Sequence, residues 1–109
     1  MIQNLEYIYM DPDDLQILQD ILKKYPYTIY AFGSRVKGTN QKFSDLDLCV
    51  IDDTMSQSTI SDLKEDLEDS NLPFTVDVTS WLMMNEDFQK LIEKDLVQIQ
   101  ANPSSAKNK

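Results

Sequence analysis

Apolar residues recur at helical spacing in three parts of the chain, and a capping residue marks where each helix begins. The first helix is expected to start at Asp11-Pro12, because aspartate caps a first turn and proline fits the first helical position. Pro26 ends this helix, since proline cannot continue it. In the last helix, Phe88, Leu91 and Ile92 are expected to face inward. The second and third helices are expected to start at Ser58 or Thr59 and at Asn85, and to run to about Glu68 and Lys94.

Four shorter segments are rich in β-branched and aromatic residues, which is typical of strands. In the second of them polar and apolar positions alternate, so Leu46 and Leu48 face the core while Asp45 and Asp47 share the opposite face. This order of elements predicts an α/β (α+β) protein with a small mixed β-sheet flanked by helices. The predicted strands are residues 28–32, 45–51, 73–78 and 97–99, the last of them a short edge strand.

The length of 109 residues fits one domain with a single core. We expect this domain to span residues 1–101. Residues 102–109 are polar and are expected to form a disordered tail. Residues 1–10 are rich in apolar side chains but predict no particular element.

Composition removes several kinds of chemistry. The chain has no histidine, which excludes His-based general bases and Ser-His-Asp triads. Cys49 is the single cysteine, so neither an internal disulfide nor a zinc cluster is expected. The net charge of −9 argues against direct binding of nucleic acid. Without a run of about 18 apolar residues, the chain is expected to be cytoplasmic, with no membrane partner.

Both glycines and the only arginine lie in one window, residues 33–38, directly after the strand at 28–32. A turn at Gly33 followed by a short helix would present backbone amides and the Ser34 hydroxyl to phosphate groups. Arg35 and Lys37 are expected to neutralise the charge of a triphosphate, and Arg35 offers bidentate geometry. The window therefore predicts a phosphate-binding turn.

Two aspartates follow this window at a spacing that suits a divalent metal. Asp45 and Asp47 would project from one face of a strand, and their carboxylates are ligands that Mg²⁺ or Mn²⁺ prefers. If the strand at 73–78 lies beside the strand at 45–51, then Asp77 completes a carboxylate triad. Three such groups can hold two metals about 4 Å apart for an in-line displacement at phosphorus. An isolated Asp-x-Asp pair arises by chance, so the signal lies in the combination with the Gly-Ser turn.

This combination resembles the Gly-Ser-x(10)-Asp-x-Asp signature of the DNA polymerase β-like nucleotidyltransferase superfamily. The residues that carry the resemblance are Gly33-Ser34 and Asp45-Leu46-Asp47. The Ser44-Asp45 step and the short length are similar to the minimal nucleotidyltransferase branch, the MntA-like antitoxins. Residues 74–78 match the strand that brings the third carboxylate, Asp77, in that family. The resemblance covers roughly residues 15 to 100.

The resemblance implies an enzyme with ATP as nucleotide donor and Mg²⁺ as cofactor. It also implies a protein partner, a HEPN-domain RNase toxin, which such antitoxins silence by transferring AMP to a tyrosine hydroxyl. By motif position, Gly33, Ser34 and Ser44 belong to the nucleotide-binding part. Asp45 and Asp47 would hold metal, and Asp77 would be a metal ligand or the general base.

Two other readings stay open at this point. One is a binding module that neutralises a toxin by contact alone. The cluster at residues 81–84 (Trp-Leu-Met-Met) would then be a partner surface, because Trp and Met are enriched in interfaces. Packing of this cluster onto the sheet is the simpler reading. A small-molecule adenylyltransferase is the third possibility, although the chain is short for the extra helical domain that such enzymes use as an acceptor pocket.

Overall fold

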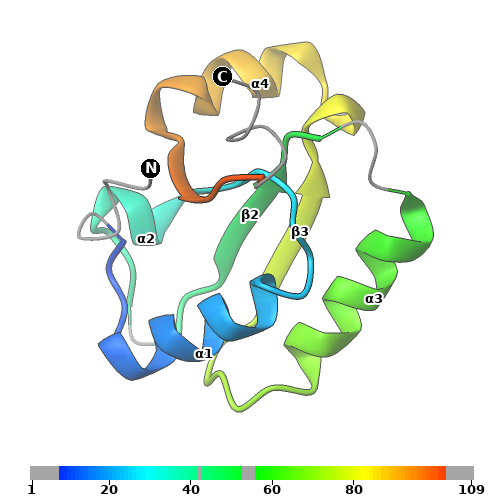
Figure 1. Cartoon of the computed structure of the whole chain (residues 1–109). Helices are drawn as coiled ribbons and strands as arrows, with labels where there is room; N and C mark the ends of the chain where they lie inside the picture. Colours follow the sequence, from blue (N-terminus) through cyan, green and yellow to red (C-terminus); the bar gives the residue numbers. More distant parts are fainter. Residues whose placement is uncertain (1–7, 42, 53–55, 103–109) are drawn as a thin grey trace.

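The computed structural model describes residues 8–41, 43–52 and 56–102. Four strands form one mixed sheet in the order β3-β2-β1-β4 (Figure 1). β1 runs antiparallel to both β2 and β4, whereas β2 and β3 are parallel and are connected through α3. The expected mixed sheet flanked by helices is therefore confirmed. The elements are α1 (Pro12–Leu22), β1 (Ile29–Phe32), α2 (Ser34–Lys37), β2 (Leu46–Val50), α3 (Gln57–Glu68), β3 (Val76–Ser80), η2 (Trp81–Met83), α4 (Glu86–Ile92), η3 (Glu93–Asp95) and β4 (Val97–Gln100).

Two hydrophobic cores lie on opposite faces of this sheet. The larger core packs α1 and α3 against one face, with Leu18, Leu63 and Leu48 almost fully buried at its centre. The smaller core contains Phe32, Cys49 and Ile92 and lies between the opposite face and α4 (Figure 1). The alternation of faces in β2 is as the sequence predicts, but it divides the side chains between two cores, Leu48 in the larger and Cys49 in the smaller, whereas the sequence predicts a single core.

The observed helix starts agree with the sequence at two places and differ at a third. Asp11 caps α1 by accepting a hydrogen bond from the Asp13 N–H, and Asn85 caps α4 through the N–H groups of Asp87 and Phe88. The cap of α3 is Ser56, whose hydroxyl accepts from the Thr59 N–H, so the helix starts before the predicted Ser58 or Thr59. Neighbouring Ser and Thr residues offer nearly the same capping oxygen, and sequence alone does not choose among them.

The last helix is shorter and less covered than its pattern suggests. α4 ends at Ile92 and continues as the 3₁₀ turn η3 instead of running to Lys94. Ile92 is 8% exposed, as expected, but Leu91 is 65% exposed and Phe88 is 40% exposed. Residues 88 and 92 are one helical turn apart and share a face, whereas residue 91 is rotated away from Ile92 by about 100°. The prediction that Leu91 faces inward is therefore wrong.

Both strands that carry the candidate aspartates begin later than predicted. β2 starts at Leu46, so Asp45 lies just before the strand, and β3 starts at Val76. The segment before β3 contains Pro73, which has no N–H to donate to a sheet, and Phe74, which is buried.

The two ends of the described chain are also packed. Ile8 is 5% exposed and belongs to the larger core, although residues 1–10 predicted no element. Asn102 donates its backbone N–H to the Thr28 hydroxyl and its side chain to Asp52, so it does not belong to the expected disordered tail. The rest of that tail, residues 103–109, lies outside the described residues. Among the helices that the structure describes, none has the length and apolar character needed to cross a membrane.

Candidate active site

The chain turns from β1 into α2 at Gly33, and this turn requires glycine for two reasons. Its φ of 92° lies in a region that side chains disfavour. A Cβ atom there would also lie 2.5 Å from Oδ2 of Asp47. Gly33 therefore allows the backbone to pass directly beside a candidate metal-binding carboxylate. α2 closes at Gly38, whose N–H donates to the Ser34 carbonyl at 2.9 Å.

The parallel pairing of β2 and β3 sets Asp47 directly opposite Asp77. Adjacent strands lie about 4.8 Å apart and opposed residues share a face, so the two side chains project from the same side of the sheet. Asp45 precedes Asp47 by two residues. The condition that the third strand lies beside the second is thus met, and the pairing brings the three predicted carboxylates into one region.

The three carboxylates influence one another electrostatically. Burial raises the pKa of Asp47, and the negative charges of Asp77 and then Asp45 raise it further. Asp47 is half-buried, whereas Asp77 and Asp45 are exposed. Negative charge thus accumulates at a place where water only partly screens it.

These residues fit a divalent cation in charge and in donor type. Carboxylate oxygens are hard ligands suited to Mg²⁺, and a cation would relieve the repulsion that raises the pKa of Asp47. Within the described residues, no three acidic, His or Cys side chains already stand at metal-binding geometry. The donor set therefore suits the ion without forming a preassembled cage.

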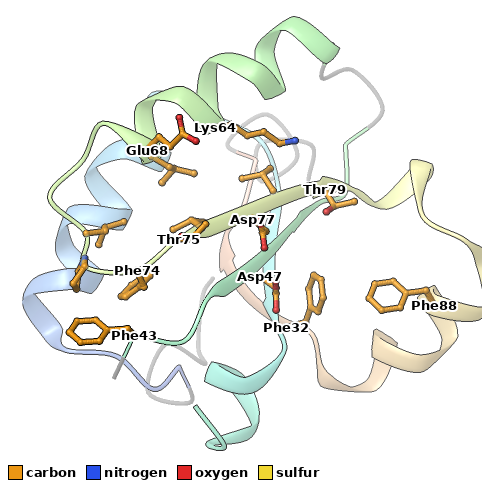
Figure 2. A pocket seen from close by; sticks show the side chains of 15 residues that line it. Phe32, Phe43, Asp47, Lys64, Glu68, Phe74, Thr75, Asp77, Thr79 and Phe88 are labelled. Carbon is orange, nitrogen blue, oxygen red and sulfur yellow. The ribbon is translucent and has the colours of Figure 1, made fainter. Parts of the chain in front are cut away.

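A cavity of about 840 Å³ opens beside the paired aspartates. Its wall follows the chain from Leu72 to Thr79 and includes Asp47 (Figure 2). Phe43 and Phe88 also line it, 62% and 40% exposed respectively. The ring of Phe88 meets Phe32 edge-on, with centroids 5.9 Å apart. The arrangement combines acidic groups with aromatic surfaces large enough to contact a planar ring.

Comparison with known proteins is decisive for the family. Residues 16–104 match the family described as "Polymerase beta, Nucleotidyltransferase". The chain belongs to this nucleotidyltransferase family. It is also 43% identical over 91 residues to the "Probable protein adenylyltransferase MntA" of Haemophilus influenzae, an alignment that covers 81% of this chain and 80% of that protein. The chain is therefore a minimal nucleotidyltransferase of the polymerase β-like superfamily, and the resemblance to this superfamily is confirmed.

In this nucleotidyltransferase Arg35 has a position that the sequence did not predict. Its side chain is 3% exposed, donates to the carbonyls of Ser44 and Tyr9 at 3.0 and 2.8 Å, and lies 4.1 Å from the ring centroid of Phe74. Burial lowers its pKa, an effect that Asp14 partly offsets. Arg35 is not among the residues that line the cavity beside Asp47. The enclosed guanidinium thus ties the loop before β2 to the segment before α1, and its expected contact with triphosphate stays a prediction.

The remaining predicted nucleotide-binding residues flank this buried arginine. Ser44 shapes the loop before Asp45, since its hydroxyl accepts from the Gln41 N–H at 2.7 Å and its carbonyl accepts from Arg35. Ser34 is half-buried at the start of α2. Lys37 is exposed and pairs with Asp95 at 3.8 Å. Nucleotide contact by Gly33, Ser34 and Ser44 stays a prediction.

Sequence reasoning missed the aromatic residues of the site. Phe43 lies in a loop without periodicity, and Phe88 fits the apolar stripe of a helix, so neither carries a signal distinct from core packing. Both line the cavity that Asp47 also lines, Phe43 from the loop before β2 beside Phe74, and Phe88 from α4 beside Phe32 (Figure 2).

Proposed function

We propose that this nucleotidyltransferase is a protein adenylyltransferase that transfers AMP from ATP to a tyrosine hydroxyl of a partner protein. The observation that carries the proposal is the pairing of Asp47 with Asp77, directly beside Gly33 and open to the cavity. A protein acceptor is supported by the name of the Haemophilus influenzae relative. The reaction is proposed to take place in the cytoplasm, where ATP is abundant.

A Mg²⁺ ion bound by Asp45, Asp47 and Asp77 would supply positive charge to the phosphate oxygens and to the attacking hydroxyl. The chain itself contributes position and proton transfer. Gly33 leaves room for the Asp47 carboxylate, because a Cβ there would lie 2.5 Å from its Oδ2, and this holds the expected phosphate-binding turn directly beside the carboxylate. Asp77 is exposed and therefore accessible to an incoming hydroxyl group.

In the proposed reaction the tyrosine oxygen forms a bond to the α-phosphorus of ATP. The bond from that phosphorus to the pyrophosphate oxygen breaks, and pyrophosphate leaves with the electron pair. The tyrosine proton passes to a carboxylate oxygen of Asp77 and then to water. The products are an adenylylated tyrosine and pyrophosphate.

The proposed partner is a HEPN-type RNase toxin, which makes this chain the antitoxin of the pair. The net charge of −9 suits a partner with a basic surface. Contact without chemistry is a second candidate for neutralisation, and one observation favours it. Leu82 and Met83 in η2 are 63% and 71% exposed, while their neighbours Trp81 and Met84 pack against the smaller core.

The test is intact-mass spectrometry of a co-expressed partner, with wild-type enzyme compared with Asp77→Asn. We expect mass increments of AMP on the partner's tyrosine that disappear in the variant. A partner that stays unmodified yet fully inhibited would favour neutralisation by contact. AMP found on a small molecule instead of on protein would favour the small-molecule adenylyltransferase.

A further inference from the structure

We propose that the acceptor protein presents its tyrosine on an extended segment that adds to the sheet along the outer edge of β3. The segment would then lie next to Asp77 and deliver the hydroxyl to it. This inference rests on the proposed function and specifies how the acceptor is bound.

The outer edge of β3 carries peptide groups that face away from the sheet. Among the described strands, β3 pairs with β2 alone. The Leu46 N–H donates to the Thr75 carbonyl at 2.9 Å, so the peptide groups of Thr75 point toward β2. Successive residues of a strand direct their peptide groups to opposite sides, so those of Val76 and Val78 point outward. An extended peptide is the ligand whose own N–H and C=O groups match such an edge.

The cavity beside the aspartates follows this same edge. Every residue from Leu72 to Thr79 lines it, which means that the open space runs along the strand instead of ending at one point (Figure 2). Lys64 and Glu68 of α3 line it as well. An open edge, an adjoining groove and the candidate active site are therefore continuous.

The spacing of strands places an acceptor side chain beside Asp77. A strand added to β3 lies about 4.8 Å from it, and alternate side chains of that strand project from the sheet face that carries Thr75, Asp77 and Thr79. A tyrosine on this face extends its hydroxyl over the paired carboxylates. A residue one position earlier or later projects from the opposite face, so the register of the added strand would select which hydroxyl is modified.

Charge helps to choose the occupant. The cavity along this edge is lined by three acidic residues, Asp47, Asp77 and Glu68, against one basic residue, Lys64, and the whole chain carries −9. A second copy of this acidic chain would meet repulsion there, whereas a basic segment of a different protein would be attracted. The proposal therefore commits to an extended, tyrosine-bearing segment of the partner.

Val76→Pro tests the edge, because a proline is tolerated at the first residue of a strand and where the N–H faces outward. Val76→Ala is its matched control, since it loses comparable side-chain packing and keeps the N–H. Both full-length proteins are assayed with ATP, Mg²⁺ and the co-expressed partner. We expect V76P to transfer AMP about tenfold more slowly than V76A, as a blocked edge loses at least one hydrogen bond to the partner. Stabilisation by ATP-Mg²⁺ in thermal unfolding should be equal in the two.

Equal transfer rates in the two variants would overturn the inference while leaving the proposed function standing. If wild type transfers no AMP to the partner, the proposed function is overturned, and this inference is overturned with it. A wild-type dimer that becomes monomeric in V76P would assign the edge to a second copy and also overturn it.

A peptide series keeps the test independent of whether V76P folds. The probe is a synthetic peptide that spans the tyrosine modified in the partner, with single N-methyl groups placed at successive positions. An added strand turns alternate N–H groups toward β3, so N-methylation should slow transfer at every second position and have little effect between them. A uniform response along the peptide, or no modification of the peptide at all, would overturn the proposal.

Discussion

At the scale of single residues, the site depends on how closely a backbone approaches a carboxylate. Gly33 directly follows β1 and Asp47 lies in the neighbouring β2, and the space between them has no room for a Cβ atom. Arg35, two residues later, is enclosed and joins the carbonyls of Tyr9 and Ser44. Two neighbours in the expected phosphate-binding window therefore differ in their surroundings: Gly33 lies against the Asp47 carboxylate, whereas the Arg35 guanidinium is bonded to backbone carbonyls.

Gly33→Ala should damage both stability and catalysis. The positive φ and the contact with Asp47 oppose any side chain, which costs about 1–3 kcal/mol of the free energy of unfolding. Displacement of the Asp47 carboxylate should lower the AMP transfer rate by about 100-fold. Chemical denaturation and a transfer assay measure the two effects, with Thr39→Ala in the exposed loop after α2 as the control. Transfer at the wild-type rate would contradict a role for Gly33 in the site.

Asp47→Asn should raise the melting temperature measured without divalent metal and abolish transfer. The pKa of Asp47 is raised in the folded protein, so its charge opposes folding. This cost is absent below the pKa of the unfolded carboxyl, near 4, and grows as pH rises through the folded pKa. The stabilising effect of the substitution should therefore be larger at pH 7 than at pH 3. Asp20→Asn on the exposed face of α1 is the control. If Asp47→Asn is less stable than wild type at pH 7, the charge of Asp47 does not oppose folding as its burial and its repulsion by Asp77 and Asp45 predict.

At the scale of elements, the sequence predicts types and order well and contacts less well. The sequence correctly predicts the alternation of faces in β2 and the helix caps Asp11 and Asn85, because each depends on neighbouring residues in the chain. The exposure of Leu91 and the burial of Arg35 depend on what lies opposite, and that is decided by the packing of distant segments. For the same reason the sequence predicts the pairing of Asp47 with Asp77 only if their two strands are neighbours, and the strand order of the sheet shows that they are.

A hydrogen bond beside the larger core joins the segment just after α1 to α3. Tyr25, just after α1, donates its hydroxyl to Asp66 of α3, and Lys24 lies 3.4 Å from the same carboxylate. This bond lowers the pKa of Asp66 and, as the main cause, raises the pKa of Tyr25 to about 12. The hydrogen bond therefore stabilises the fold at pH values where Asp66 is ionised and Tyr25 is neutral.

Tyr25→Phe should lower the melting temperature at pH 7 and make it less dependent on pH. In wild type the contribution of Asp66 is complete above the unfolded carboxyl pKa, near 4, and is lost as pH falls through the lower folded value. The contribution of Tyr25 is complete below about 10 and is lost as pH rises toward 12. Melting curves from pH 2 to pH 11 compare the variant with Tyr27→Phe. A constant difference across this range would contradict the proposed bond.

At the scale of the whole molecule, the two faces of the sheet are covered unequally. α1 and α3 enclose one face, whereas the described part of the opposite face is met mainly by the short α4 and its flanking turns (Figure 1). The carboxylates lie beside the open cavity that results. Few described elements remain to enclose an acceptor, which is consistent with an acceptor brought by another protein.

ATP together with Mg²⁺ should stabilise the whole molecule more than either does alone. A ligand at 100 times its Kd that binds only the folded state adds about 2.7 kcal/mol, which for a chain of this size raises Tm by about 10 °C. Differential scanning fluorimetry measures the shift, with Asp45→Asn expected to lose the part that depends on Mg²⁺. An unchanged melting temperature at saturating ATP-Mg²⁺ would count against the nucleotide site.

The crossover through α3 also decides when during synthesis this enzyme becomes competent. Asp47 and Asp77 are 30 positions apart in the chain, and they become neighbours only after β2 and β3 pair in parallel. Pairing of this kind is non-local, so it pays the entropy of closing a long loop before it gains its contacts. A nascent chain that has released β2 but not β3 from the ribosome holds two of the three carboxylates and none of their final geometry. The pairing that sets Asp47 opposite Asp77 therefore forms only after both strands have been made.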